Sequence, residues 1–136
     1  MDILLDASAI MAIILNEQSR NTVVTLTRDT TLLSPDVISF EIGNALVNLY
    51  RKQKITENEL LEAYSNFTLI PIRNIKINIE KALKIACRYN IYAYDAYYLE
   101  IASRLKIPLI TFDESMKKVA LHLKINILDK LSQTEE

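Results

Sequence analysis

Four acidic residues stand in this sequence where apolar runs end or helical patterns begin: Asp6 in ILLDASAI, Glu41 in SPDVISFEIGNALV, Asp95 in YAYDAYYL and Asp113 in LITFDES. A carboxylate beside an apolar run is costly to bury unless a cation joins it. Carboxylate oxygens are also the ligands that hard divalent cations prefer in proteins. The recurrence of this pattern therefore indicates a metal site.

The same four acids would repel one another wherever they met. Two carboxylates about 4 Å apart cost about 4 kcal/mol at an effective dielectric constant near 20, so a cluster either holds a cation or keeps one member protonated. Oxygen ligands alone suit Mg²⁺ or Mn²⁺, whereas Zn²⁺ favours His and Cys. Because the chain has one His and one Cys, a zinc site is disfavoured.

These two residues, His122 and Cys87, both lie in helical patterns. His122 sits late in the pattern KKVALHLK, where a packed or half-exposed helix position is expected, which disfavours a histidine-based nucleophile system. Cys87 has no partner for an intramolecular disulfide and is predicted to be a buried thiol in a reducing compartment.

The composition bounds the kind of protein. The chain has 136 residues, half of them hydrophobic, and a net charge of -1. We expect one domain over residues 1–131 and a frayed tail over residues 132–136. The balanced charge excludes a global basic field for nucleic acid, so any RNA contact depends on local patches. Without a bilayer-spanning apolar run or a basic, apolar leader, the chain is expected to be cytoplasmic and to have no membrane partner.

Short β-rich runs alternate with longer segments of helical periodicity. The runs cover residues 3–6, 31–34, 68–72, 108–112 and 125–128. This alternation predicts a three-layer α/β/α fold with a central, mostly parallel five-stranded sheet. Helices are expected over residues 36–53, 76–90, 94–106 and 113–124, and after a Thr56–Glu59 capping box.

The fold class brings the acids together. In an open parallel sheet, ligands bind outside the carboxyl ends of the strands. Asp6 closes the first predicted strand and Asp113 follows the fourth, while Glu41 and Asp95 lie in the first turns of crossover helices. All four side chains are therefore expected to reach the same edge of the sheet.

Without a nucleophile or a histidine base, the chemistry left to such a cluster is metal-assisted hydrolysis of a phosphodiester. Asp6 would be a direct metal ligand, Asp95 and Asp113 would share the metal or orient the attacking water, and Glu41 would complete the ligand shell. Supporting hydrogen bonds are expected from Ser8, Thr111 and Asn44.

Three segments, ILLDASAI, SPDVISFEIGNALV and YAYDAYYLEIASRLKIPLITFDE, resemble in this order a PIN domain, most closely a VapC-type toxin of a toxin–antitoxin pair. The likeness covers roughly residues 2–128. It implies an acidic quartet made of Asp6, Glu41, Asp95 and Asp113. It also implies small polar support from Ser8, Asn44 and Thr111. It also implies dependence on Mg²⁺ or Mn²⁺, cleavage of RNA, a homodimer and a small antitoxin that blocks the site.

Other interpretations remain open. Asp6, Asp95 and Asp113 are also suited to cap helices or to favour a helix dipole. A phosphoryl-accepting receiver domain would need an acidic pair after the first strand, and a haloacid-dehalogenase-like phosphatase would need Asp in place of Ser8. Neither pattern is present. The principal alternative is a catalytically silent PIN-like domain that binds RNA or protein.

Lys117 and Lys118 follow closely after Asp113 and are candidates for contacts with an RNA backbone. Five of the seven tyrosines fall between Tyr89 and Tyr98. They are candidates for stacking bases, but packing of the helix pair or of a subunit interface is the favoured interpretation. Apolar helix positions indicate self-association, and they include Ile42, Leu46, Leu49, Leu60 and Leu61.

Overall fold

The computed structural model describes residues 1–129. The predicted domain end at residue 131 and the predicted tail over 132–136 lie outside this range. Seven helices and four strands alternate within it, in the order β1 (Asp2–Leu5), α1 (Ala7–Ile14), α2 (Arg20–Leu26), β2 (Thr31–Pro35), α3 (Ile38–Arg51), α4 (Glu57–Thr68), β3 (Ile72–Ile75), α5 (Ile79–Tyr89), α6 (Ala93–Leu105), β4 (Leu109–Ile110) and α7 (Glu114–His122). None of these helices has the length and apolar character needed to cross a bilayer.

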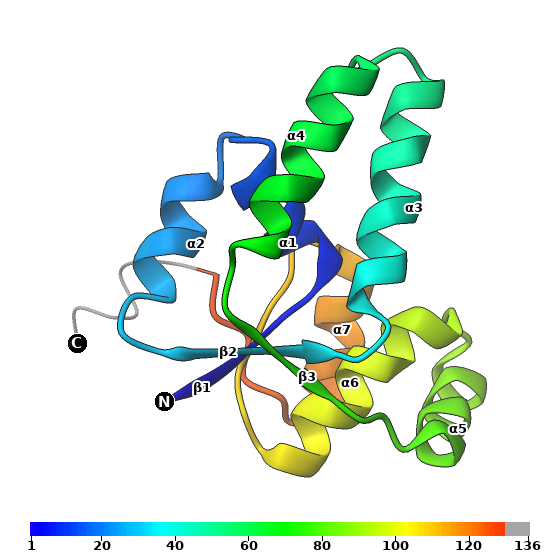
Figure 1. The fold of residues 1–136 in the computed structure, drawn as a ribbon. Coiled ribbons are helices and arrows are strands. Elements are labelled where there is room, and N and C mark those ends of the chain that lie inside the picture. Colours follow the sequence, from blue (N-terminus) through cyan, green and yellow to red (C-terminus); the bar gives the residue numbers. More distant parts are fainter. Residues whose placement is uncertain (130–136) are drawn as a thin grey trace.

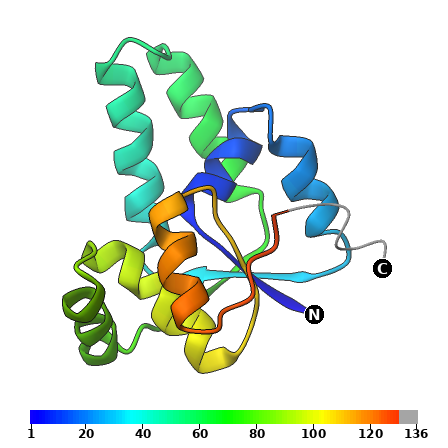
Figure 2. The ribbon, with the colours of Figure 1, turned by 180° about the vertical axis from the view of Figure 1, so that it is seen from behind.

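All strand pairs are parallel, and the strands lie in the order β3-β2-β1-β4. The chain moves outward from β1 to β3 and then returns to the other side of β1. Because parallel crossovers are right-handed, this reversal sends the later helices to the opposite face of the sheet. In Figures 1 and 2, α3 and α4 lie on one side of the strands, and α5, α6 and α7 on the other. The predicted α/β/α layering is confirmed, and the strand order reverses between β1 and β4.

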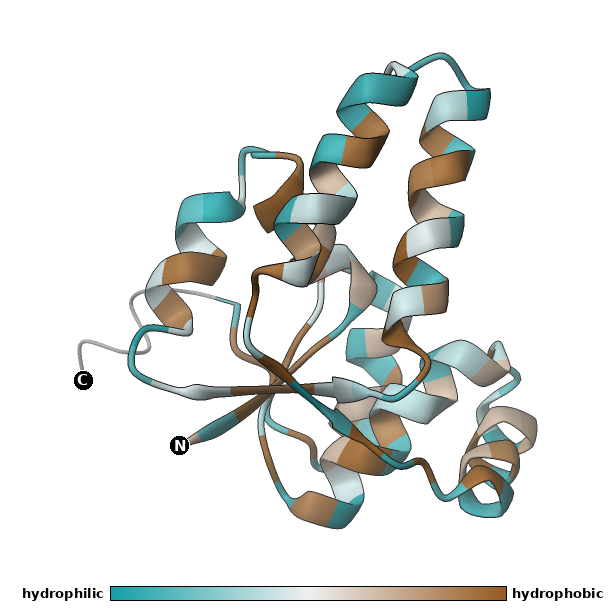
Figure 3. Ribbon diagram, in the orientation of Figure 1, coloured by the Kyte–Doolittle hydropathy of each residue, from teal (hydrophilic) through white to brown (hydrophobic). Residues whose placement is uncertain are grey.

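The sheet is the centre of the core. Ile3, Leu4 and Leu5 are each fully buried, so β1 shows no alternation of apolar and polar residues. A parallel strand that is covered on both faces is expected to be continuously apolar. Figure 3 shows hydrophobic colouring along the strands and on helix surfaces that face them. This rigid layer carries the residues at its carboxyl edge.

Two predicted strands differ from the structure. The third was expected over residues 68–72, but Thr68 ends α4 and pairing with β2 begins at Ile72. The local apolar pattern did not reveal that α4 continues this far. The fifth, over 125–128, is reduced to a parallel bridge between Leu109 and Ile127. β4 has two residues, so it offers too short a partner for a longer ladder.

The capping box that was predicted before α4 is present. The backbone N–H of Glu59 donates to the Thr56 hydroxyl at 3.1 Å, and the Thr56 N–H donates to the Glu59 carboxylate at 2.9 Å. α3 and α4 then pack against each other and stand out from the sheet as a pair (Figure 1). Within this pair Ile42 and Leu46 are buried, whereas Leu61 is exposed. Much of the apolar surface that suggested self-association is therefore covered within the chain.

Cys87 is exposed, so the prediction of a buried thiol was wrong. It lies on α5, whose described contacts are chiefly with α6. Leu83, one turn earlier, and Ile79, two turns earlier, are exposed as well. Helical periodicity identified α5 correctly, but it did not show that this outer surface lacks a covering element within residues 1–129.

Candidate active site

Asp6 lies at the turn between β1 and α1 and is 3% exposed. It is the N-cap of α1, and its Oδ1 accepts hydrogen bonds from the Ala9 N–H at 3.0 Å and the Ser8 hydroxyl at 2.6 Å. The Thr111 hydroxyl, which follows β4, donates to Oδ2. Asp6 therefore caps α1 and belongs to the site at the same time. The cap uses Oδ1, whereas Oδ2 is bonded by the hydroxyl of Thr111, the residue after β4.

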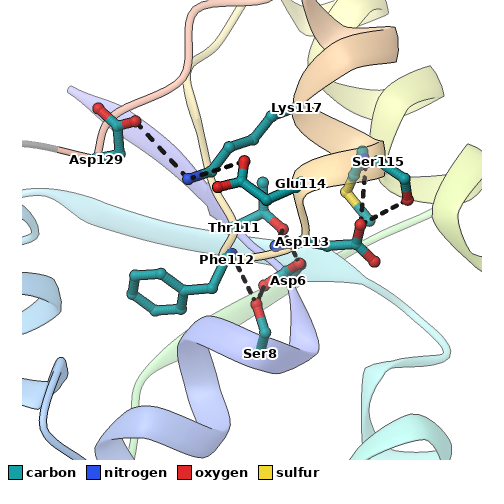
Figure 4. A network of polar contacts seen from close by, with 10 residues as sticks. Asp6, Ser8, Thr111, Phe112, Asp113, Glu114, Ser115, Lys117 and Asp129 are labelled. Carbon is teal, nitrogen blue, oxygen red and sulfur yellow. Dashed lines mark hydrogen bonds and ion pairs between the residues drawn. The ribbon is translucent and has the colours of Figure 1, made fainter.

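The hydroxyls that hold Asp6 have a fixed hydrogen-bond direction. The Ser8 hydroxyl accepts from the Phe112 N–H at 3.0 Å, and the Thr111 hydroxyl accepts from the Asp113 N–H at 3.1 Å. A backbone N–H only donates, so each hydroxyl must direct its single proton at Asp6. Figure 4 shows this network joining the β1–α1 and β4–α7 turns. It favours an ionised Asp6, although burial raises the pKa of the Asp6 carboxyl, with a smaller contribution from Asp113.

Asp113 is the N-cap of α7. Its Oδ1 accepts from the Ser115 hydroxyl at 2.6 Å and from the Met116 N–H at 3.1 Å. The hydrogen bond from Ser115 is the main cause that lowers the pKa of Asp113 below its usual value. The hydrogen bond from Met116 confirms the capping interpretation. Because its pKa is lowered, the carboxylate is ionised at neutral pH, so Asp113 keeps its negative charge at the sheet edge.

Glu41 lies in the first turn of α3 and accepts a hydrogen bond of 2.7 Å on Oε1 from the Tyr98 hydroxyl. Tyr98 is 1% exposed and projects from α6. Burial raises the pKa of Glu41 to about 7; the Tyr98 hydrogen bond opposes this rise, and the charges of Asp6 and Asp95 add to it. Glu41 accordingly exchanges a proton near neutral pH.

Asp95 lies in the first turn of α6. Its pKa is raised by burial first and then by the charges of Asp113 and Asp6. Asp6 likewise raises the pKa of Glu41. The contacts agree with these charge effects: Thr111 bonds both Asp6 and the Asp113 N–H, and one hollow is lined by Glu41, Asp95 and Ala7, the residue after Asp6. The structure therefore brings the predicted quartet to one edge of the sheet.

The fit of this group to a divalent cation rests on its donor chemistry. All four side chains offer carboxylate oxygens, which suit Mg²⁺ or Mn²⁺, and no His or Cys stands among them. As the side chains are arranged across residues 1–129, no three acidic, His or Cys residues are close enough together to hold a metal. Several of the oxygens are turned instead toward protein donors, including Ser8, Tyr98 and Ser115.

A hollow of about 390 Å³ lies beside Glu41 and Asp95. Asn44, predicted to support the site, lines it one turn after Glu41. A second hollow of about 440 Å³ contains Ser8 and Phe112 and shares the lining residues Ala45 and Asn48 with the first. The two form adjacent depressions along α3, so the acidic edge is open to a ligand larger than a single ion.

The two lysines that were predicted to contact RNA have different environments. The Lys117 ammonium lies 3.8 Å from both the Glu114 and the Asp129 carboxylates (Figure 4). Lys118 is exposed and forms no ion pair with any described residue. Lys118 is therefore the freer of the two to meet a phosphate.

Sequence reasoning assigned the tyrosines mainly to packing and missed the contact of Tyr98 with Glu41. Tyr98 is buried as that view expects, whereas Tyr92 and Tyr94 are exposed. The only local signal for Tyr98 was its position three residues after Asp95, about one helical turn away, which places both side chains on the same side of α6.

His122 lies on α7 and packs its ring against Tyr89, with 6.0 Å between the centroids, outside the acidic group.

The pattern of the PIN domain matches residues 3–121. The chain therefore belongs to the PIN domain family. This membership agrees with the parallel sheet, its flanking helices and the placement of acids at one edge.

Two curated relatives are similar along most of their length. Ribonuclease VapC3 from Pyrobaculum aerophilum is 25% identical over 121 residues, which cover 85% of this chain and 92% of the relative. Ribonuclease VapC12 from Mycobacterium tuberculosis is 28% identical over 113 residues, which cover 82% and 86%.

Solved structures share the fold. A Pyrobaculum aerophilum protein superposes with a TM-score of 0.66 at 18% identity, covering 91% of this chain and 90% of that one. VapBC2 from Rickettsia felis, solved bound to a DNA fragment from its promoter, gives 0.63 at 13% identity with 94% and 98% coverage. A toxin–antitoxin complex from Klebsiella pneumoniae gives 0.55 at 15% identity with 82% and 86% coverage.

Proposed function

We propose that this protein is an Mg²⁺- or Mn²⁺-dependent endoribonuclease and the toxin of a toxin–antitoxin pair. The observation that carries the proposal is the state of Asp6, a buried carboxylate held by three donors at the junction of β1 and β4. The charges of three further acids act around it. Holding such carboxylates together costs free energy through burial and mutual repulsion, which points to a site built for a cation.

Asp6, Asp95 and Asp113 are the proposed metal ligands, and Glu41 completes the set. When bound, the ion supplies positive charge that offsets the carboxylates and the scissile phosphate and lowers the pKa of a coordinated water. Ser8 and Thr111 keep Asp6 in one orientation. Because one Glu41 oxygen is free of Tyr98, Glu41 is suited to take a proton from the attacking water.

The choice of RNA as substrate is supported by the two ribonuclease relatives. The antitoxin partner is supported by the shared fold of a toxin–antitoxin complex, and a homodimer is proposed from the same resemblance. The net charge of -1 gives the chain no overall basic field, so charge does not add support for RNA or for the other partners. The alternative remains a silent domain that binds RNA or protein through the same edge without cutting.

The deciding experiment measures growth arrest and RNA cleavage in the same cells. Expression of the wild type is expected to arrest growth, and mapping of cellular RNA ends is expected to reveal cuts at defined positions. Asp6→Asn and Asp95→Asn should abolish both effects. Asp2→Asn is the matched control, because Asp2 lies at the opposite end of β1 and is exposed.

Purified protein then tests the metal. Cleavage of pooled RNA should require added Mg²⁺ or Mn²⁺ and should stop with EDTA. If the Asp6→Asn/Asp95→Asn double variant cuts at the same rate as the wild type, the assigned site is wrong. If the wild type binds RNA with no cleavage in either metal, the silent domain is the better description.

A further inference from the structure

Three aromatic rings gather around the hollow beside Glu41 and Asp95. Phe40 is 73% exposed, Tyr92 is 83% exposed and Tyr94 is 48% exposed. Each lines this hollow. They are the three most exposed of the chain's ten aromatic residues, all of which lie within residues 1–129. Aromatic side chains normally bury 150–250 Å² each, so three exposed rings around one depression indicate a ligand surface.

The hollow favours an uncharged, flat ligand. No Lys or Arg lines it, and the carboxylates of Glu41 and Asp95 repel a phosphate that enters without a cation. The amides of Asn44 and Asn48, one helical turn apart on α3, add hydrogen-bond donors and acceptors. Flat faces with polar edges are the features of a nucleobase, which stacks on aromatic rings in a sequence-tolerant way.

The rings are tied to the acids by their positions in the chain. Phe40 directly precedes Glu41 in α3, and Tyr94 directly precedes Asp95 in α6. Tyr94 also packs edge-on against Tyr97, with centroids 5.4 Å apart and planes at 70°, which fixes its ring. A base in this hollow therefore belongs to a nucleotide immediately beside the bond that the acids would cleave.

We infer that Phe40, Tyr92 and Tyr94 form a stacking subsite for an unpaired nucleobase next to the scissile phosphodiester, with Asn44 and Asn48 at the base edge. The inference rests on the proposed ribonuclease function and deepens it. Stacking on these rings requires a base whose face is free. The preferred substrate is therefore single-stranded or looped RNA, and duplex RNA is excluded from the subsite.

The chain has no Trp, so Tyr92→Trp introduces a single fluorescent reporter that keeps an aromatic ring at the subsite. The variant is mixed in a stopped-flow instrument, with Mn²⁺, against short single-stranded RNAs of mixed sequence and against the same RNAs annealed to their complements. Quenching of the Trp emission by the single strands, and little by the duplexes, is the expected result. Equal quenching by duplexes, or none by single strands, overturns the subsite.

Steady-state cleavage gives a second readout. Phe40→Ala and Tyr92→Ala should each raise KM about tenfold, the effect of losing one base–aromatic stack, with a small change in kcat. Tyr92→Phe should recover the affinity that Tyr92→Ala loses, because the ring and not the hydroxyl makes the contact. Tyr64→Ala is the matched control, since Tyr64 is 40% exposed on α4 and does not line the hollow.

The subsite and the proposed function fail in different ways. Cleavage by the wild type with unchanged KM in Phe40→Ala and Tyr92→Ala refutes the subsite and leaves the nuclease intact. Quenching by single-stranded RNA without any cleavage refutes the enzyme and leaves the subsite. If the Trp responds to a purified antitoxin and never to RNA, the rings belong to a protein interface and the inference is wrong.

Discussion

The Tyr98 hydroxyl donates a 2.7 Å hydrogen bond to Glu41 Oε1 across 57 positions of the sequence. This contact joins α6 to α3, and it connects the buried interior with the acidic edge. Glu41 keeps a pKa of about 7 because burial and neighbouring charge outweigh this hydrogen bond. Tyr98 stays protonated, since burial and the Glu41 charge raise its own pKa.

The metal-free protein should lose stability as pH rises from about 4.5 to 7. The pKa of Glu41 is 4.5 as a free group and about 7 in the fold, so in this window the folded state binds more protons than the unfolded state. The difference is worth about 3 kcal/mol, which partial solvent exposure reduces to about 2 kcal/mol. Urea unfolding at pH 5 and pH 7.5 measures it.

Glu41→Gln should flatten much of this pH dependence, because Gln does not titrate and still accepts from Tyr98. Tyr98→Phe should act in the opposite direction, since removal of the hydrogen bond raises the pKa of Glu41 further. The fall in stability would then be centred at higher pH. An identical pH profile in the wild type and Glu41→Gln would contradict the assignment.

Thr111→Val should destabilise the fold by about 1–3 kcal/mol, because it leaves the buried Asp6 Oδ2 and the Asp113 N–H without their partner. The measurement is the free energy of unfolding in urea at pH 7. Thr68→Val makes the same side-chain change where the hydroxyl only bonds the Ser65 carbonyl at an exposed position. A loss no larger than that of Thr68→Val would show that the network contributes little.

Mn²⁺ should raise the melting temperature of the wild type, by an amount equivalent to about 2.7 kcal/mol at a concentration of one hundred times Kd. Without metal, Asp95→Asn should melt at a higher temperature than the wild type. The substitution removes a carboxylate that Asp113 and Asp6 repel, and that carboxylate accepts no hydrogen bond from another described residue. The variant should also respond weakly to Mn²⁺. Asp2→Asn should behave as the wild type does, and a full Mn²⁺ response in Asp95→Asn would remove Asp95 from the ligand set.

Lys118→Ala should weaken RNA binding more than Lys117→Ala does. Lys118 is exposed without an ion pair among the described residues, whereas Lys117 is held by Glu114 and Asp129. Loss of one phosphate contact should reduce the slope of log affinity against log salt by roughly 1. Fluorescence anisotropy across a salt series tests this order, and equal slopes for both variants and the wild type would exclude a backbone contact by either lysine.

Much of the fold and the site could be read from local pattern. Apolar runs and helical periodicity indicated a parallel α/β sheet, and Thr56 with Glu59 indicated the start of α4. The positions of Asp6 and Asp113 at strand ends, together with the lack of suitable His and Cys, indicated an acidic edge for a hard cation. These features depend on neighbours within a turn or a strand, so sequence spacing carries them.

Other features depend on packing between distant elements. The order β3-β2-β1-β4 sets Thr111 against Asp6, and α6 lies where Tyr98 reaches Glu41. Cys87 and Tyr92 are exposed because no described element covers them. Periodicity states which residues share a face of a helix, but burial of that face depends on what the rest of the chain places against it. The acids were thus evident from local sequence, whereas their hydrogen-bond partners and the aromatic rings around them emerged only from the assembled fold.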